Sequence, residues 1–126
     1  MTFGTVRRIG LTLPDVEEGT MYGAPALKVR GQMFVCMASH KSAEPNTLAV
    51  RMDFAERDAL IEEDPGTYYL KEHYVNYPCV LVRLSHVGED AMRDLLSGAH
   101  RFVSATATKA RPRIGRPRGT RRQRTR

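Results

Sequence analysis

The sequence contains no tryptophan, only two cysteines and, over its last 22 positions, no acidic residue. No stretch approaches the roughly 20 apolar residues of a membrane-spanning helix, and the N-terminal MTFGTVRRIGLTLP holds no apolar run of signal-peptide length. Without a secretory signal, Cys36 and Cys79 are expected to be free thiols in a reducing compartment. These absences argue against a membrane protein or a secreted disulfide scaffold, and they predict a soluble cytoplasmic protein.

The motifs of common enzyme classes are also missing. The four histidines show no metal-ligand spacing, no Cys-x-x-Cys accompanies them, and there is no phosphate-binding or dinucleotide-binding glycine motif. The pairs Glu17-Glu18 and Glu62-Glu63 are adjacent in sequence, so neither pair shares a helix face as an acid and a base would. The sequence therefore predicts no catalytic residue, metal or cofactor. An enzyme would need a pocket that joins His73, Tyr74 and Arg51.

Charge is divided unevenly along the 126 residues. Residues 1–104 carry 11 Lys and Arg against 14 Asp and Glu, a net charge of −3, whereas residues 105–126 carry 9 Lys and Arg and no acid, a net charge of +9. The net charge of the whole chain, +6, therefore comes from its end. This asymmetry predicts a mildly acidic folded body followed by a basic interaction tail.

Three segments have the periodicity of amphipathic helices. The first runs from Phe3 to Leu13 and is followed by Pro14, and the last covers 88–103 with its apolar residues on one face. Between them, Asp53 can cap a helix in which Glu56 follows three residues later.

The remaining apolar segments predict strands. Three lie before the middle helix, at 26–31, 33–38 and 47–54, and two lie after it, at the start of 67–78 and at 79–84. Short turns between consecutive strands favour antiparallel pairing. The order helix, three strands, helix, two strands, helix thus predicts a two-layer α+β fold, with an antiparallel sheet of about five strands and helices on one face.

The chain is expected to hold one domain, residues 1–104, followed by a tail, residues 105–126. No apolar period survives after Ser104, so we expect the Arg-rich tail to be disordered when free.

Three stretches, LPDVEEGTMYGAPALKVRGQMFVCM, LAVRMDFAERDALIEEDPGTYYL and HYVNYPCVLVRL, resemble the MmcQ/YjbR family of small bacterial proteins. The most specific pieces are Tyr22-Gly23 with Pro25, Lys28-Val29 with Gly31, and Tyr77-Pro78. The resemblance covers nearly all of the body and implies a two-layer antiparallel α+β fold. It also implies DNA binding, as the family is commonly described, and no catalytic residues. Many members have Trp near the position of Tyr77, which this chain lacks, and the basic tail is not part of the family pattern.

The tail, ARPRIGRPRGTRRQRTR, is dominated by arginine, whose planar fork suits phosphate and narrow minor grooves better than the lysine ammonium does. Its IGRPR segment resembles the AT-hook core, in which an extended Arg-Gly-Arg-Pro lies in an A·T minor groove, with Ile114 in place of the first Arg. Candidate nucleic-acid-binding residues are Arg111, Arg113, Gly115, Arg116, Pro117, Arg118, Arg121, Arg122, Arg124 and Arg126. Three interpretations remain: non-specific contact with nucleic acid, an A·T preference, and a solubilising tail.

A second basic patch is expected on the sheet. Lys28, Arg30, Arg51 and Arg83 all fall on predicted strands, and they would share the open face if helices cover the other one. The alternative is a solvated polar face that also holds Asp53 and other acids.

An aromatic segment precedes the last predicted strand. It comprises Tyr68, Tyr69, His73, Tyr74 and Tyr77. These rings either stack exposed bases beside a basic strip or pack at the edge of the sheet, and packing is the favoured interpretation.

Two functions from different classes follow. The leading hypothesis is a cytoplasmic or nucleoid-associated bacterial protein that binds DNA, or RNA, through its tail, without sequence readout beyond a preference for A·T-rich minor grooves. The alternative is a protein- or small-ligand-binding module that uses its sheet face, with the tail as an accessory anchor to anionic surfaces.

Overall fold

The computed structural model of the chain describes residues 1–110, with side chains as far as Ala105. The candidate tail residues from Arg111 to Arg126 lie outside the described residues. The elements in chain order are α1 Phe3–Gly10, β1 Val16–Met21, β2 Ala24–Val29, β3 Gln32–Met37, β4 Thr47–Arg51, α2 Phe54–Glu63, β5 Tyr68–Tyr69, the 3-10 turn η1 Glu72–Tyr74, β6 Cys79–Arg83 and α3 Glu89–Ala110.

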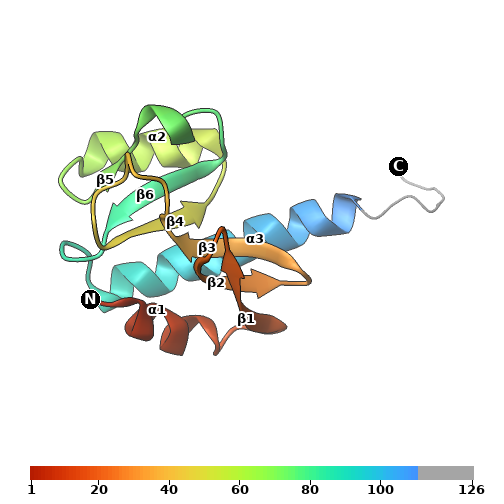
Figure 1. Cartoon of the computed structure of the whole chain (residues 1–126). Coiled ribbons are helices and arrows are strands. Elements are labelled where there is room, and N and C mark those ends of the chain that lie inside the picture. Colours follow the sequence, from red (N-terminus) through yellow and green to blue (C-terminus); the bar gives the residue numbers. More distant parts are fainter. Residues whose placement is uncertain (111–126) are drawn as a thin grey trace.

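The strands form one antiparallel sheet in the order β1-β2-β3-β4-β6-β5 (Figure 1). This confirms the predicted α+β fold. The described sheet has six strands rather than about five because β1 occupies a segment that is not among the predicted strands. Glu17, Glu18 and Gly19 are poor strand formers. They adopt the strand because β1 is an edge strand paired with β2 along its whole length.

Two tight hairpin turns connect the first three strands. Met21 pairs with Ala24 and Val29 pairs with Gln32, which leaves two residues in each turn. Both turns have two positive φ angles in succession: 54° and 81° at Tyr22-Gly23, 54° and 80° at Arg30-Gly31. Such turns match the twist of the strands and favour Asn or Gly. Arg30 is therefore a turn residue, which corrects its predicted place on a strand.

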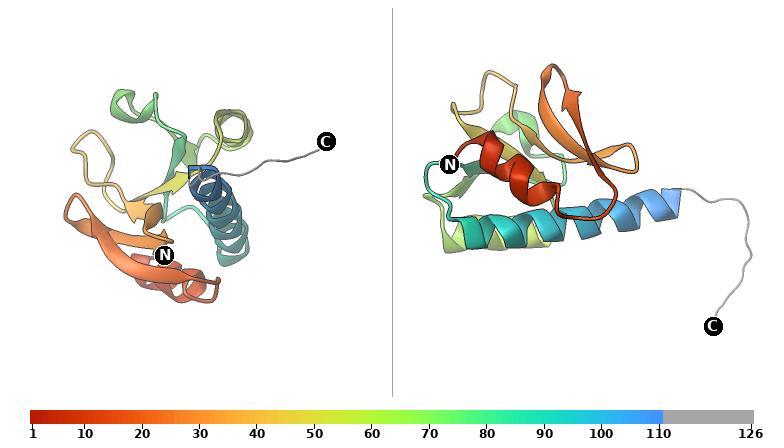
Figure 2. Two further views of the ribbon diagram at one scale, coloured as in Figure 1. Left: turned by 90° about the vertical axis from the view of Figure 1, so that its right-hand side faces the viewer. Right: turned by 90° about the horizontal axis from the view of Figure 1, so that it is seen from below.

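One face of the sheet is covered by helices and holds the main core. Figure 2 shows α1 and α3 side by side against this face. Val6 and Ile9 of α1 and Met92, Leu96 and Val103 of α3 are buried. From the sheet, the facing residues include Leu27, Val29, Val35, Leu48, Val50, Val80 and Val82. The long apolar stripe of α3 is what the sequence periodicity predicts.

A bulge in β3 turns two successive residues, Phe34 and Val35, toward the helix-covered face of the sheet. Leu27 pairs with Val35 and Lys28 pairs with Met33, so Phe34 is the extra residue on β3. The Phe34 ring is fully buried and meets the ring of His100 of α3 edge to face at 5.6 Å. Met33 consequently faces the opposite side of the sheet, where it packs beside Cys36.

Local sequence determines where α2 begins and how far α3 extends. Asp53 caps α2, as predicted, and its side chain accepts a hydrogen bond from the Glu56 amide at 2.8 Å. Helix α3 continues to Ala110, so the domain boundary predicted at Ser104 falls inside it. A helix can outlast its buried stripe because alanine has the highest helix propensity, and the first proline after α3 is Pro112.

Candidate ligand-binding site on the sheet face

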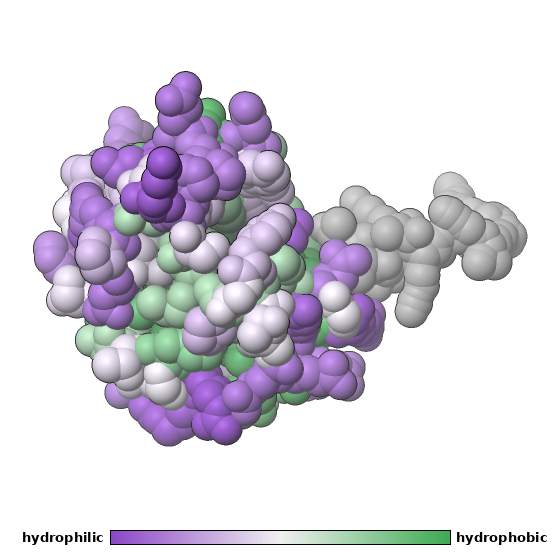
Figure 3. Space-filling view, in the orientation of Figure 1, coloured by the Kyte–Doolittle hydropathy of each residue, from purple (hydrophilic) through white to green (hydrophobic). Residues whose placement is uncertain are grey.

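A pocket of about 650 Å³ opens on the face of the sheet that the helices leave uncovered. Figure 3 shows apolar residues gathered in the middle of one face of the molecule and ringed by hydrophilic ones. The floor of the pocket comes from strands β3, β4 and β6, which contribute Met33, Cys36, Ala49, Arg51 and Cys79. The volume lies within the range of about 300–1,000 Å³ that is usual for small-molecule sites.

Three segments build the walls. The end of β1 and the β1–β2 turn contribute Met21 and Tyr22, and the segment after β3 contributes Ala38, Ser39 and His40. The third wall runs from η1 to the start of β6 and contains His73, Tyr74, Tyr77 and Pro78. Segments far apart in the sequence therefore meet around one apolar hollow.

The wall between η1 and β6 is fixed by a buried arginine. Arg57 of α2 donates to the carbonyl oxygens of Val75 and Tyr77, at 2.9 and 3.3 Å. Its guanidinium also pairs with Asp58 and lies 4.7 Å from the ring centre of Phe54. A buried charge with these partners is well satisfied, so Arg57 positions the wall.

The wall after β3 is fixed by Arg83. Its guanidinium makes a two-pronged contact with Glu44, at 2.8 and 2.7 Å, and it donates to the carbonyl oxygens of Pro65 and Gly66. It also lies 4.2 Å from the ring centre of Tyr69. The Tyr69 hydroxyl accepts from the Glu44 amide at 2.9 Å. Arg83 thus ties β6 to the loop after β3.

Two histidine rings stack at the pocket. The His40 and His73 ring centres are 3.7 Å apart. His40 Nδ1 accepts from the Ser42 amide at 3.1 Å, which requires this nitrogen to be unprotonated. Partial burial, the neighbouring His73 and Lys41 all lower the pKa of His40. His40 is therefore neutral near pH 7.

The two thiols of the floor, Cys36 and Cys79, are free and buried. Burial raises the pKa of Cys36 to about 11 and that of Cys79 to about 11, although Arg51 acts in the opposite direction on both. Thiols with such pKa values are protonated at neutral pH, and the thiolate is the reactive form. The pocket therefore offers apolar sulfur surface and no activated nucleophile at these positions.

Arg51 is the only fixed cation among the described residues that line the pocket, and none of those residues is a carboxylate. Its Nη1 donates to the Met33 carbonyl oxygen at 3.3 Å, and its guanidinium lies 5.8 Å from the ring centre of Phe102 of α3. Its Nε is buried and has no hydrogen-bond partner. Within the described residues, Arg51 forms no ion pair.

The predicted basic patch does not form one strip. Lys28, Arg51 and Arg83 do lie on the helix-free face, as their alternation with buried residues predicts. However, Arg30 is in a turn, Arg83 is paired with Glu44, and Lys28 lies opposite Glu17 of β1 in register. Acids in neighbouring elements, which periodicity alone does not reveal, thus face two of the four cations.

The aromatic segment is divided between packing and the pocket. Tyr68 and Tyr69 of β5 are buried, as the packing interpretation expects. His73, Tyr74 and Tyr77 line the pocket, where they join Arg51. Of these, His73, Tyr74 and Arg51 are the grouping that an enzyme would need.

The sequence pattern does not reveal that Met21 and Tyr22 belong to the pocket. Tyr22 is 88% exposed and Tyr77 is 55% exposed, and both are at the pocket. A bulky residue rarely takes a positive φ, and Tyr22 does so in a turn that favours Asn or Gly. In the sequence, the signal for a functional role was a tyrosine directly before Gly23, at a turn position where Asn or Gly is usual.

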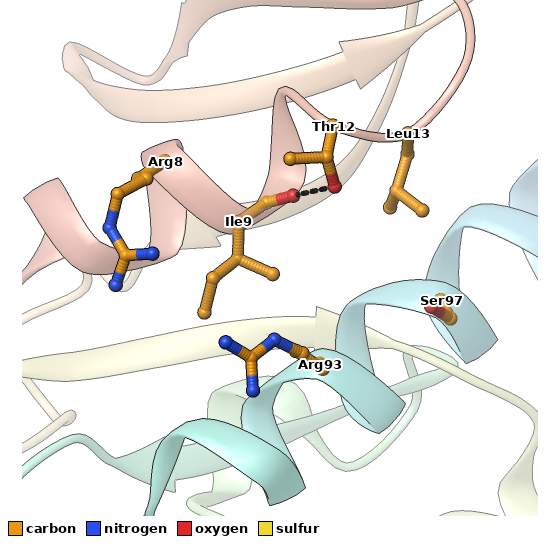
Figure 4. Close-up of a pocket in the computed structure, with 6 residues that line it drawn as sticks. All are labelled: Arg8, Ile9, Thr12, Leu13, Arg93 and Ser97. Atoms are coloured by element: carbon orange, nitrogen blue, oxygen red, sulfur yellow. Dashed lines mark hydrogen bonds between the residues drawn. The ribbon is translucent and has the colours of Figure 1, made fainter.

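A smaller cavity of about 210 Å³ lies between α1 and α3 (Figure 4). Arg8, Ile9, Thr12 and Leu13 face Arg93 and Ser97 across it. The Thr12 hydroxyl donates to the Ile9 carbonyl oxygen at 2.6 Å. Arg8 and Arg93 both pair with Glu89, and Arg93 also pairs with Asp90, so the two cations are matched by two carboxylates and the cavity is the weaker candidate.

The family model described as YjbR matches residues 11–102, most of the chain. The chain belongs to the YjbR family. The predicted family resemblance is thereby confirmed, whereas the model ends before the Arg-rich tail and gives no support to its likeness to an AT-hook.

A solved structure has the same fold as this YjbR-family chain. The crystal structure of Deinococcus radiodurans protein DR2400, whose domain carries the family name DUF419, is similar with a TM-score of 0.70 and 22% identity. The similarity covers 86% of this chain and 83% of that one. No curated protein matches the chain.

Two further findings concern the described part of this YjbR-family chain. Across residues 1–110, no helix is long and apolar enough to cross a membrane. Over the same residues, no three His, Cys, Asp or Glu side chains are grouped so as to hold a metal ion.

Proposed function

We propose that the YjbR-family domain is a binding module for a small, largely apolar ligand, which it holds in the pocket on the helix-free face of its sheet. The observation that carries this proposal is the pocket of about 650 Å³, lined by sulfur, aromatic and small side chains with one cation among them. Sites of this size and composition are the usual location of small-molecule binding.

Exposed aromatic surface at the pocket supports the proposal. Tyr22 and Tyr77 leave large apolar areas in contact with water, and Tyr22 does so from a strained backbone conformation. Strain of this kind persists where the surrounding structure imposes it, and it is concentrated at functional sites. Arg57 and Arg83 hold the walls in place, so the pocket is preformed rather than assembled by the ligand.

A neutral fluorescent probe tests the proposal. N-phenyl-1-naphthylamine brightens on entering an apolar site, and its lack of charge removes electrostatic attraction to the tail. We expect saturable one-to-one binding that Tyr77→Ala weakens about tenfold or more, because the variant removes an aromatic wall. Leu11→Ala, which truncates an exposed apolar residue outside the pocket, should bind as the unaltered protein does. Equal effects of the two substitutions would count against the site.

The division of charge supports a second function, and here we propose that the protein is cytoplasmic or nucleoid-associated and that its tail binds DNA or RNA. The tail carries +9 against −3 for residues 1–104, and arginine supplies nearly all of that charge. Such a tail would neutralise phosphates without sequence readout, with at most a preference for A·T-rich minor grooves. The proposed binding residues are the arginines from Arg111 to Arg126 with Gly115 and Pro117.

Salt-dependent binding to duplex DNA tests the second proposal. Seven to nine neutralised phosphates predict that log K falls against log salt with a slope of roughly −6 to −8. Replacing the eight arginines of the tail by Gln leaves only Lys109 and should reduce the slope to about −1, whereas Lys28→Gln with Arg30→Gln should preserve it. Comparing A·T-rich duplex, G·C-rich duplex and single-stranded RNA of equal length distinguishes non-specific DNA binding, a preference for A·T-rich DNA and a preference for RNA. Binding that survives the loss of the tail arginines would refute the proposal.

A further inference from the structure

The charge environment of Arg51 is unlike that of the other arginines around the sheet. Arg83 pairs with Glu44 and Arg57 pairs with Asp58. Arg51 has one long hydrogen bond, to the Met33 carbonyl oxygen at 3.3 Å, and a buried Nε without a partner. A buried donor left unpaired costs free energy that a bound acceptor would recover. The pocket is therefore lined by a cation that has one unpaired, buried hydrogen-bond donor.

The lining strengthens the attraction for a negative charge. The described lining residues include no carboxylate, although residues 1–104 have a net charge of −3. Both thiols beside Arg51 are in their neutral form near pH 7 because their pKa values are about 11. In a partly buried site a lone cation interacts with an anion more strongly than it would in water. No side chain that lines the pocket neutralises Arg51, so a negatively charged group of a ligand can do so.

The other walls indicate the body of the ligand. Tyr22, Tyr74 and Tyr77 offer aromatic faces, and Met21 and Met33 offer adaptable apolar contacts. One fixed cation matches one negative charge, whereas phosphate-rich ligands such as nucleotides call for several donors. Resting on the proposed function of the pocket, we infer that its ligand is a small aromatic monocarboxylate whose acid group is bound by Arg51.

The binding mode follows from the present position of Arg51. Because Nε is shielded from solvent, a ligand reaches it only if the guanidinium turns toward the hollow. That movement breaks one 3.3 Å hydrogen bond to Met33 and gives up a 5.8 Å contact with the Phe102 ring. In return, a carboxylate can accept from Nε and one Nη together, the two-pronged geometry that suits arginine and not lysine.

A pair of probes that differ in charge tests the inference. Naphthalene-2-carboxylate and naphthalene-2-carboxamide have nearly the same shape, and isothermal titration of the full chain gives a dissociation constant for each. We expect the carboxylate to bind at least about tenfold more tightly, since hydrogen bonds between charged groups are stronger than neutral ones. Arg51→Gln should remove this preference while leaving carboxamide binding within about threefold. Arg101→Gln, an exposed arginine outside the pocket, should retain it.

The outcomes separate the two claims. If both probes bind equally, or if the preference survives Arg51→Gln, the inference about the anion is overturned and the proposed binding pocket stands. If neither probe binds, both are overturned. Arg51→Lys provides a second variant that keeps the positive charge but lacks the forked guanidinium. Its preference for the carboxylate over the carboxamide should fall between those of the unaltered chain and Arg51→Gln.

Discussion

At the scale of single residues, the environment decides what an arginine does. Arg51 and Arg83 both lie on the helix-free face of neighbouring strands, and the sequence pattern treats them alike. Arg83 has Glu44 and two carbonyl oxygens within reach and so holds a loop in place. Arg51 lies in the pocket and has no acid partner among the described residues. The difference comes from elements distant in sequence, so the strand pattern could predict the face and not the role.

Tyr22 provides a test of the idea that strain and binding occur together. Asn tolerates a positive φ better than Tyr, so Tyr22→Asn should raise the free energy of unfolding by about 1 kcal/mol. The same substitution removes an exposed ring from the pocket and should weaken binding of N-phenyl-1-naphthylamine. Urea unfolding and probe titration measure the two effects. A variant that is less stable, or one that binds the probe equally well, would argue against a functional tyrosine here.

The ion pair of Glu44 with Arg83 makes a pH-dependent prediction. Hydrogen bonds from Arg83 hold the pKa of Glu44 below its ordinary value of 4.5. The stabilisation is therefore complete above pH 4.5 and is lost as the pH falls through the lowered pKa. The melting temperature of the unaltered protein should exceed that of Glu44→Gln at neutral pH, and the gap should shrink in acid. A gap that stays constant with pH would show that the carboxylate contributes through its shape alone.

At the scale of elements, the close approach of α1 to the sheet depends on a glycine. A Cβ at Gly10 would collide with Leu27, which is fully buried and cannot move aside freely. Gly10→Ala should therefore lower the free energy of unfolding by about 1–3 kcal/mol, the usual effect of overpacking.

Gly4 in the same helix provides the matched control. A Cβ there meets only the Thr2 side chain, at 3.4 Å. Gly4→Ala should raise stability by about 0.5–1 kcal/mol through helix propensity. Denaturant unfolding of both variants measures the contrast, and a loss of similar size in both would show that α1 does not pack as described.

The elements also show where sequence pattern suffices and where it fails. Local sequence patterns predicted the three helices and the cap at Asp53, because each depends on residues within one segment. They missed β1, whose strand conformation comes from pairing with β2. They also placed the end of α3 too early, at Val103, because helix propensity persists after the buried stripe ends. The pocket was beyond prediction since its walls come from three separated segments.

At the scale of the whole molecule, the two faces of the sheet have different roles. The helix-covered face holds the main core, and the opposite face holds a smaller apolar cluster beside the pocket. Membership of the YjbR family fixes the fold of this body, whereas the +9 tail follows the region that the family model matches. Ligand binding by the body and nucleic-acid binding by the tail are therefore separable proposals.

The methionine methyl groups allow the central claim, a binding pocket on the sheet face, to be measured directly. Met21 and Met33 line the pocket, whereas Met52 and Met92 are buried in the core on the helix side. Methyl NMR of the full chain during titration with N-phenyl-1-naphthylamine reports on both faces at once. Binding in this pocket should shift the Met21 and Met33 signals along one saturable curve, while those of Met52 and Met92 stay fixed. Shifts at Met52 and Met92 alone, or no shift at Met21 and Met33 at saturation, would contradict binding in this pocket.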